Sequence, residues 1–90
     1  MELTDLRCEI DKIDDKLVKL FVQRMEISAQ VAAYKKEHQL PIFVPEREQE
    51  KLEDVALKAG SEMADYAKSL YAAIFELSRS YQSKLIREDT

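Results

Sequence analysis

The chain has 90 residues, 46% of them hydrophobic and 36% charged, and a formal net charge of −4. This length allows one small domain over residues 1–90, and the negative charge argues against nucleic acid as a partner, because phosphate binding normally requires a basic face. The single Cys and single His exclude an internal disulfide and a thiolate metal site, so we expect neither a metal nor a cofactor. We find no apolar run of membrane-spanning length and no signal-peptide pattern, and we therefore expect a cytoplasmic protein with no membrane partner.

The first predicted element is a long helix from Thr4, the expected N-cap, to about Glu37. Its apolar residues recur at steps of three and four, close to a heptad repeat: Leu3, Leu6, Ile10, Ile13, Leu17, Leu20, Ile27, Val31 and Tyr34. At about 1.5 Å per residue the helix is roughly 50 Å long, whereas a compact chain of this size has a radius of gyration of about 12 Å. The rest of the chain is too small to cover such a rod, so we expect a second copy to cover it.

A short loop over His38–Val44 is predicted next, because residues before Pro41 are pushed away from helical geometry. Pro45 suits the first position of a second helix, and Gly60 suits its end. Val44 stands at the N-cap position of this helix and offers no side-chain acceptor, so we expect the second helix to begin without a side-chain cap.

The third helix follows a connection over Ser61–Asp65, with Ser61 or Asp65 as its expected cap, and ends near Ile86. Its inner face is predicted from residues at helical spacing: Tyr66, Leu70, Ala73, Ile74, Leu77, Tyr81 and Leu85. The basic residues of this helix are expected to face elsewhere: Lys68, Arg79, Lys84 and Arg87. The predicted fold class is therefore all-α, with one long, one short and one intermediate helix.

Arg24 interrupts the apolar row of the first helix, where a guanidinium is costly unless it meets an anion. Two interpretations stay open: Arg24 snorkels or pairs with a glutamate of another helix, or it binds a charged ligand. Lys35 lies eleven residues further, on the same side and about 16 Å along the axis, with Ser28 and Val31 between the two cations. Taken singly, Lys35 is also explained as a solvated cation near a helix C-terminus.

Arg7 borders the same row seventeen residues before Arg24, which is about 25 Å along a helix. One small ligand cannot contact both side chains within one rod. Arg7 therefore serves such a site only from the other chain of an antiparallel pair, or else it is a surface arginine.

Four further positions are candidates for a site. Arg47 falls in the first turn of the second helix, where the helix dipole disfavours a cation, while Glu48 beside it suits the dipole. Ser78 and Gln82 lie four residues apart on one face of the third helix. Small polar residues at such positions usually border a core, so these two gain a role only from the resemblance that follows.

Four segments occur in this order: L-R-C-E-I-D-K-I-D-D-K-L-V-K-L, R-M-E-I-S-A-Q-V-A-A-Y-K, L-P-I-F-V-P-E-R-E and E-L-S-R-S-Y-Q. Together, from Leu3 to Leu85, they resemble the all-helical chorismate mutase family. The resemblance implies that the three helices form an intertwined homodimeric helix bundle, in which each active site borrows an arginine from the partner chain.

The resemblance also implies which residues bind the doubly negative substrate: Arg7, Arg24, Lys35, Arg47, Glu48, Ser78 and Gln82. Arg7 would be the arginine contributed across the dimer, while Arg24 and Ser78 would hold carboxylates. Lys35 would contact a carboxylate and the ether oxygen, and Gln82 would donate to the ether oxygen.

Arg47 and Glu48 correspond to an Arg-Glu pair whose acid binds the ring hydroxyl, so that Lys35, Glu48 and Gln82 are the implied catalytic residues. Val44 departs from the pattern, because many relatives have an acidic or amide residue there that also touches the hydroxyl.

The implied activity is the Claisen-type rearrangement of chorismate to prephenate in Phe and Tyr biosynthesis, which requires no nucleophile, metal or proton shuttle. Two alternatives stay open: an isochorismate-pyruvate lyase of the same fold, and a non-catalytic helical dimerisation module in which a protein carboxylate satisfies Arg24. Association with, or fusion to, a neighbouring shikimate-pathway enzyme is also compatible with the resemblance.

Overall fold

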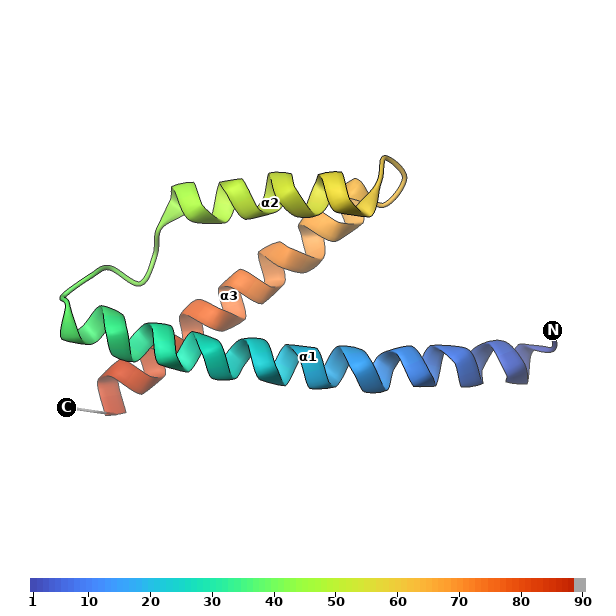
Figure 1. Ribbon diagram of the computed structural model, residues 1–90, viewed down its shortest axis with the longest axis horizontal. Coiled ribbons are helices and arrows are strands. Elements are labelled where there is room, and N and C mark those ends of the chain that lie inside the picture. The colour runs from blue at the N-terminus through green and yellow to red at the C-terminus, as the bar shows by residue number, and fades with distance from the viewer. Residues whose placement is uncertain (89–90) are drawn as a thin grey trace.

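The computed structural model describes residues 1–88, which form three α-helices and no strand. They are α1 (Leu3–Glu37), α2 (Pro45–Ala59) and α3 (Ala64–Glu88), so the predicted all-α class and the order of helix lengths are confirmed. In Figure 1, α1 spans the long axis, α2 runs above it, and α3 crosses obliquely from the end of α2 to the C-terminal part of α1. The chain measures 54 × 27 × 14 Å with a radius of gyration of 16.3 Å, against about 12 Å for a compact chain.

The start of α1 differs from the prediction, because its N-cap is Glu2 and not Thr4. The backbone N–H of Glu2 donates to the Asp5 carboxylate at 3.1 Å, which is the contact that a residue three positions after an N-cap makes in a capping box. The negative charge of Asp5 also lies where the helix dipole favours it. Thr4 is consequently a residue inside the first turn.

The end of α1 is closed by the local geometry of Gln39, whose φ of 57° is left-handed. The N–H of Gln39 donates to the carbonyl of Lys36 at 3.3 Å, and the N–H of Leu40 donates to the carbonyl of Lys35 at 2.8 Å. These are the two bonds of a Schellman motif, which ends a helix by satisfying its last carbonyls. Lys35 is therefore held in a well-defined last turn.

The predicted limits of α2 are confirmed, since it begins at Pro45 after Val44, which makes no side-chain cap hydrogen bond, and ends before Gly60. The prediction for α3 is wrong at its start, because α3 begins at Ala64. The carbonyl of Gly60 accepts the N–H of Met63 at 3.1 Å, and the carbonyl of Met63 accepts the N–H of Ala67 at 2.8 Å. The connecting turn thus leads directly into the helix, without Ser61 or Asp65 as a cap.

The core lies where α3 packs against both other helices. Its buried members are small or polar as well as apolar: Ala32, Val55 and Phe75, with Ser28, Ser78 and Gln82. The inner face predicted for α3 is mostly uncovered in one chain, because Tyr66, Leu70 and Leu77 are 73%, 55% and 51% exposed. Within one chain, α3 packs instead through a second face that includes Phe75 and Ser78.

The apolar row of α1 is also uncovered. Every member from Leu3 to Leu20 is exposed, and the N-terminal half of α1, blue in Figure 1, runs beyond the part that α3 crosses. Among the described residues no helix is both long and apolar enough to cross a membrane. The single chain thus presents a continuous apolar strip along one side of a rod.

Gly60 provides a test of the turn between α2 and α3. Its φ of 86° and ψ of 163° belong to a region that residues with a Cβ avoid, and no atom lies within 4 Å of a Cβ built there. We therefore expect Gly60→Ala to lower the free energy of unfolding by about 1–3 kcal/mol through backbone strain alone.

Urea denaturation at a fixed protein concentration measures this change. The neighbouring exposed residue supplies the control, since Ser61→Ala should alter the free energy of unfolding by no more than about 0.5 kcal/mol. Equal stability of the two variants would contradict the strained turn.

Candidate active site

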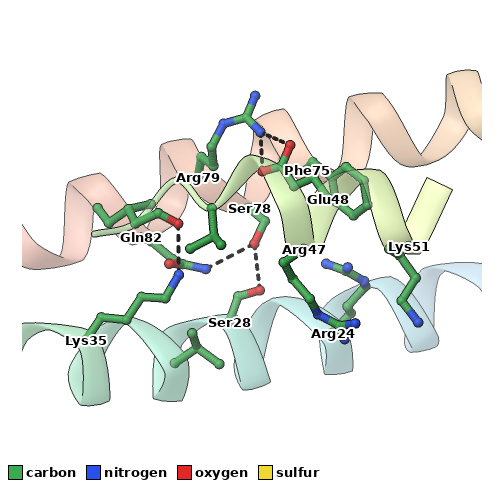
Figure 2. A pocket seen from close by; sticks show the side chains of 13 residues that line it. Arg24, Ser28, Lys35, Arg47, Glu48, Lys51, Phe75, Ser78, Arg79 and Gln82 are labelled. Atoms are coloured by element: carbon green, nitrogen blue, oxygen red, sulfur yellow. Dashed lines mark hydrogen bonds and ion pairs between the residues drawn. The ribbon is translucent and has the colours of Figure 1, made fainter. Parts of the chain in front are cut away.

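A cavity of about 400 Å³ lies where the three helices and the loop after α1 meet. This volume is in the range of small-molecule sites, about 300–1,000 Å³. Figure 2 shows the cavity from close by, with charged and polar side chains around it. It is lined by Arg24, Ser28, Val31, Lys35, Ile42, Val44, Arg47, Glu48, Lys51, Phe75, Ser78, Arg79 and Gln82.

The contribution of α1 comes from one helical face, because Arg24, Ser28, Val31 and Lys35 follow at steps of four, three and four. In Figure 2, Lys35 lies at the end of the cavity near Gln82, and Arg24 lies toward the other end. The structure thus brings together the two cations that the sequence predicted on one side of this helix, with the two smaller side chains between them.

Arg24 is placed by aromatic rings and not by a carboxylate. Its guanidinium carbon lies 5.9 Å from the ring centroid of Tyr71 and 5.8 Å from that of Phe75, distances at which cation–π attraction acts. Among residues 1–88 no carboxylate forms an ion pair with Arg24. Its hydrogen-bonding capacity therefore remains available to a ligand.

Lys35 is oriented by the loop, because its ammonium nitrogen Nζ donates to the carbonyl of Ile42 at 2.8 Å. An ammonium group has three donors, so two remain for a ligand. Since the backbone of Lys35 is fixed by the helix-ending turn and its side chain is fixed by the loop, the cation is held at both ends.

A chain of three buried polar side chains joins α1 to α3. The hydroxyl oxygens of Ser28 and Ser78 are 2.7 Å apart, and Nε2 of Gln82 donates to Oγ of Ser78 at 3.3 Å. The remaining amide oxygen, Oε1 of Gln82, is buried without a hydrogen-bond partner.

Rotating this amide by half a turn removes the unpaired acceptor. Ser28 then donates to Ser78, Ser78 donates to Oε1 of Gln82, and the amide N–H₂ group is the one left unpaired. Because heavy-atom positions are nearly unchanged by the rotation, the site offers a ligand either an acceptor or a donor at Gln82.

The helix α2 contributes both positively and negatively charged side chains to the cavity. Glu48 pairs with Arg79 of α3, whereas Lys51 donates to Asp54 of its own helix at 3.3 Å. Hydrogen bonds from Lys58 and Lys51 hold the pKa of the Asp54 carboxyl below its usual value of 3.8. Two of the lining cations are thereby matched with carboxylates.

Arg47 is exposed at the edge of the cavity and forms no ion pair among the described residues. With Arg24 and Lys35 it makes three lining cations that lack a carboxylate partner in this part of the chain. No group of His, Cys, Asp and Glu among residues 1–88 could hold a metal ion. The charge of the cavity is therefore set by side chains and favours an anion.

The structure brings six of the seven residues named by the resemblance to this cavity and leaves one out. Arg7 is exposed on the N-terminal half of α1 and does not line the cavity. The prediction that Arg79 faces elsewhere is wrong, since it lines the cavity and contacts Glu48. Lys51 and Phe75 were also missed, because a helical repeat identifies faces but not which of them a neighbouring helix encloses.

The buried serine pair leads to a testable prediction. Ser28→Ala removes one of the two partners of the Ser78 hydroxyl, and Ser78→Ala leaves the Ser28 hydroxyl and the Gln82 amide without this partner. We expect each substitution to lower the free energy of unfolding by about 1–3 kcal/mol. The double variant should cost less than the sum of the two, because it removes both partners together.

Urea denaturation of the unmodified chain, the two single variants and the double variant, all at one protein concentration, measures this double-mutant cycle. The matched control is Ser69→Ala, an exposed serine of α3, which should change the free energy of unfolding by no more than about 0.5 kcal/mol. Strict additivity of Ser28→Ala and Ser78→Ala would show that the two hydroxyls do not interact.

Comparison with known proteins agrees with this arrangement. The model of the type II chorismate mutase family matches residues 6–83. The chain is 52% identical over 46 residues to the T-protein of Haemophilus influenzae, an alignment covering 51% of this chain and 12% of that protein. It is 41% identical over 54 residues to the bifunctional chorismate mutase/prephenate dehydratase of Aquifex aeolicus, covering 60% of this chain and 15% of that protein.

A shorter relative, the chorismate mutase of Methanocaldococcus jannaschii, is 40% identical over 47 residues, which cover 52% of this chain and 48% of the relative. The chain thus spans less than half the length of each of these relatives. No solved structure matches it significantly. Since the family model covers most of the chain, from the first turns of α1 to the last turns of α3, this chain belongs to the type II chorismate mutase family.

Proposed function

We propose that this chain catalyses the rearrangement of chorismate to prephenate, a step in the biosynthesis of Phe and Tyr. The observation that carries the proposal is that Arg24, Lys35 and Arg47 line one cavity without a carboxylate partner among residues 1–88. Such a concave site favours a small ligand with more than one negative charge. Chorismate has two carboxylates, and the chorismate mutase relatives support this choice of dianion.

The cations divide between the two ends of the substrate. Arg24 and Arg47 are suited to a carboxylate, because a guanidinium binds one through two parallel hydrogen bonds and fixes its direction. The Ser78 hydroxyl, buried beside them in the middle of the cavity, can add a further donor. Fixing both carboxylates would hold the flexible enolpyruvyl group over the ring, which removes much of the entropic barrier of an intramolecular reaction.

Lys35 and Gln82 act where charge develops. As the bond from the ether oxygen to the ring carbon breaks, negative charge grows on that oxygen, and preorganised donors stabilise it more in the transition state than in the ground state. Lys35 has two unused donors, and the amide N–H₂ of Gln82 has a second N–H beside the one that it donates to Ser78. Glu48 would accept the hydrogen bond of the ring hydroxyl.

The rate acceleration expected of an ordinary enzyme is compatible with what these groups can supply. An acceleration of about a millionfold requires about 8 kcal/mol, and removing a single donor to a developing oxyanion commonly costs about 3–4 kcal/mol. A few charged donors in a partly enclosed cavity are therefore sufficient without covalent or metal chemistry in the reaction step.

The assembly is part of the proposal. We infer a homodimer in which a second chain covers the exposed apolar strip of α1 and contributes Arg7 to this cavity. The support is the exposure of the row from Leu3 to Leu20, together with the distance of about 25 Å between Arg7 and Arg24 along one helix. Fusion to a second enzyme, as the name of the Aquifex aeolicus relative indicates for that protein, is compatible with this arrangement.

Three substitutions test the assignment of the site. We expect Arg24→Ala, Lys35→Ala and Gln82→Ala each to lower kcat/KM for chorismate by about a hundredfold or more, because each removes a donor aimed at the substrate. The loss of chorismate absorbance measures the rate, and circular dichroism shows whether the helices persist. Near-normal rates in all three folded variants would refute the assignment.

Product analysis separates the alternatives. The purified chain should convert chorismate to prephenate and should not release pyruvate from isochorismate, which a lyase would do. If neither substrate reacts or binds, and Arg24→Leu leaves stability unchanged or raises it, the chain is a dimerisation module without this activity.

Complementation tests the borrowed arginine. In the proposed dimer, Arg7→Ala and Arg24→Ala damage the same active site from opposite chains, so each variant alone should be nearly inactive. A mixed dimer contains one site with both arginines intact, and mixing the two proteins after dissociation should restore part of the activity. The control is a mixture of Arg24→Ala with Lys35→Ala, which should restore no activity, because both residues serve the site of their own chain and each site of the mixed dimer then lacks one of them.

A further inference from the structure

Arg79 connects three segments around the cavity. Its terminal nitrogen Nη1 donates to both carboxylate oxygens of Glu48 on α2, and its guanidinium carbon lies 4.8 Å from the ring centroid of Phe43 in the loop after α1. The Arg79 and Glu48 side chains are only 33% and 23% exposed. In Figure 2 this pair lies on the side of the cavity away from Ser28 and Arg24.

We propose that Arg79 is a positioning residue that orients the Glu48 carboxylate toward the ring hydroxyl of the substrate, an inference that rests on the proposed function. An ionised carboxylate offers about four lone-pair positions, and Arg79 occupies one on each oxygen. Each oxygen of Glu48 therefore keeps capacity to accept a hydrogen bond from a ligand. Arg79 acts through this carboxylate and makes no contact with the substrate itself.

The surrounding charges explain why Glu48 needs such a partner. Glu48 is the one carboxylate among the described residues that line the cavity, and Arg47 and Lys51 lie beside it on the same helix. Lys51 is three positions further, close enough on a helix to attract the carboxylate along the surface of α2. Instead Lys51 bonds to Asp54, and Arg79 of α3 holds Glu48.

The loop supports this arrangement. A free arginine side chain has many rotamers, and stacking on the ring of Phe43 restricts them before a ligand arrives. Val44 next to it lines the cavity with an apolar side chain and cannot accept a hydrogen bond. The recognition of a hydroxyl at this end of the cavity thus depends on Glu48 alone among the lining carboxylates, which makes its orientation decisive.

A double-mutant cycle with Arg79→Gln and Glu48→Gln tests the inference by steady-state kinetics with chorismate. Arg79→Gln should lower kcat/KM by about tenfold to a hundredfold, the effect of a hydrogen bond to a charged group. The same substitution made in the Glu48→Gln protein should have almost no further effect. Arg79→Lys should recover only part of the loss, because an ammonium lacks the planar group that stacks on Phe43.

The matched control is Lys68→Gln, which removes an exposed cation of the same helix and should leave kcat/KM unchanged. If Arg79→Gln equals the unmodified chain, or if it lowers kcat/KM equally in the Glu48→Gln protein, Arg79 does not act through Glu48 and the inference is overturned. Circular dichroism and the thermal midpoint of each variant establish that it is folded. Failure of the unmodified chain to convert chorismate would overturn the proposed function as well, so the two failures are distinguishable.

Discussion

The close approach of α1 and α3 at Ser28 and Ser78 is the contact on which the site depends. Their hydroxyl oxygens are 2.7 Å apart, and Ala32, one turn further along α1, is 1% exposed. Small side chains at these positions allow the two helices to approach closely. In the described chain α3 packs against both other helices, whereas α1 and α2 do not pack against each other. The position of Arg47 and Glu48 relative to α1 is therefore determined by α3 and by the loop after α1.

The carboxylates of α2 determine which charges around the cavity remain unpaired. Carboxylates on α2 match two of the cations around the cavity, Asp54 with Lys51 and Glu48 with Arg79. Such partly exposed pairs contribute little to stability, so their main consequence is electrostatic: they lower the excess positive charge and fix where it lies. The cations left over come from α1 and the first turn of α2, which places them on the side of the cavity opposite Arg79, and an anionic ligand is directed toward that side.

The sequence was sufficient for features that depend on one helix. Periodicity predicted the length of α1 and the common face of Arg24 and Lys35, because both follow from 3.6 residues per turn. It could not decide between neighbouring caps at Glu2 and Thr4, which differ only in local hydrogen bonds. It also missed Arg79, because one position beyond Ser78 is about 100° around the helix, and only the packing of α2 on that flank brings this side chain into the cavity. The roles of Ser78 and Gln82 came from the family resemblance, since small polar residues beside an apolar row carry little signal of their own.

In the proposed dimer, the uncovered half of α1 would link association to ligand binding. The N-terminal half of α1 does not line the cavity of its own chain. It also extends beyond the part of α1 that packs against α3 (Figure 1). In the proposed dimer, the segment that buries the apolar strip also carries the arginine that reaches the other cavity, so ligand and partner bind the same folded arrangement. A ligand that binds only the assembled site must then stabilise the dimer by mass action. Under this proposal the site needs the exposed row as much as the fold does, because without it the cavity would keep its three unpaired cations but would not gain Arg7 as the fourth.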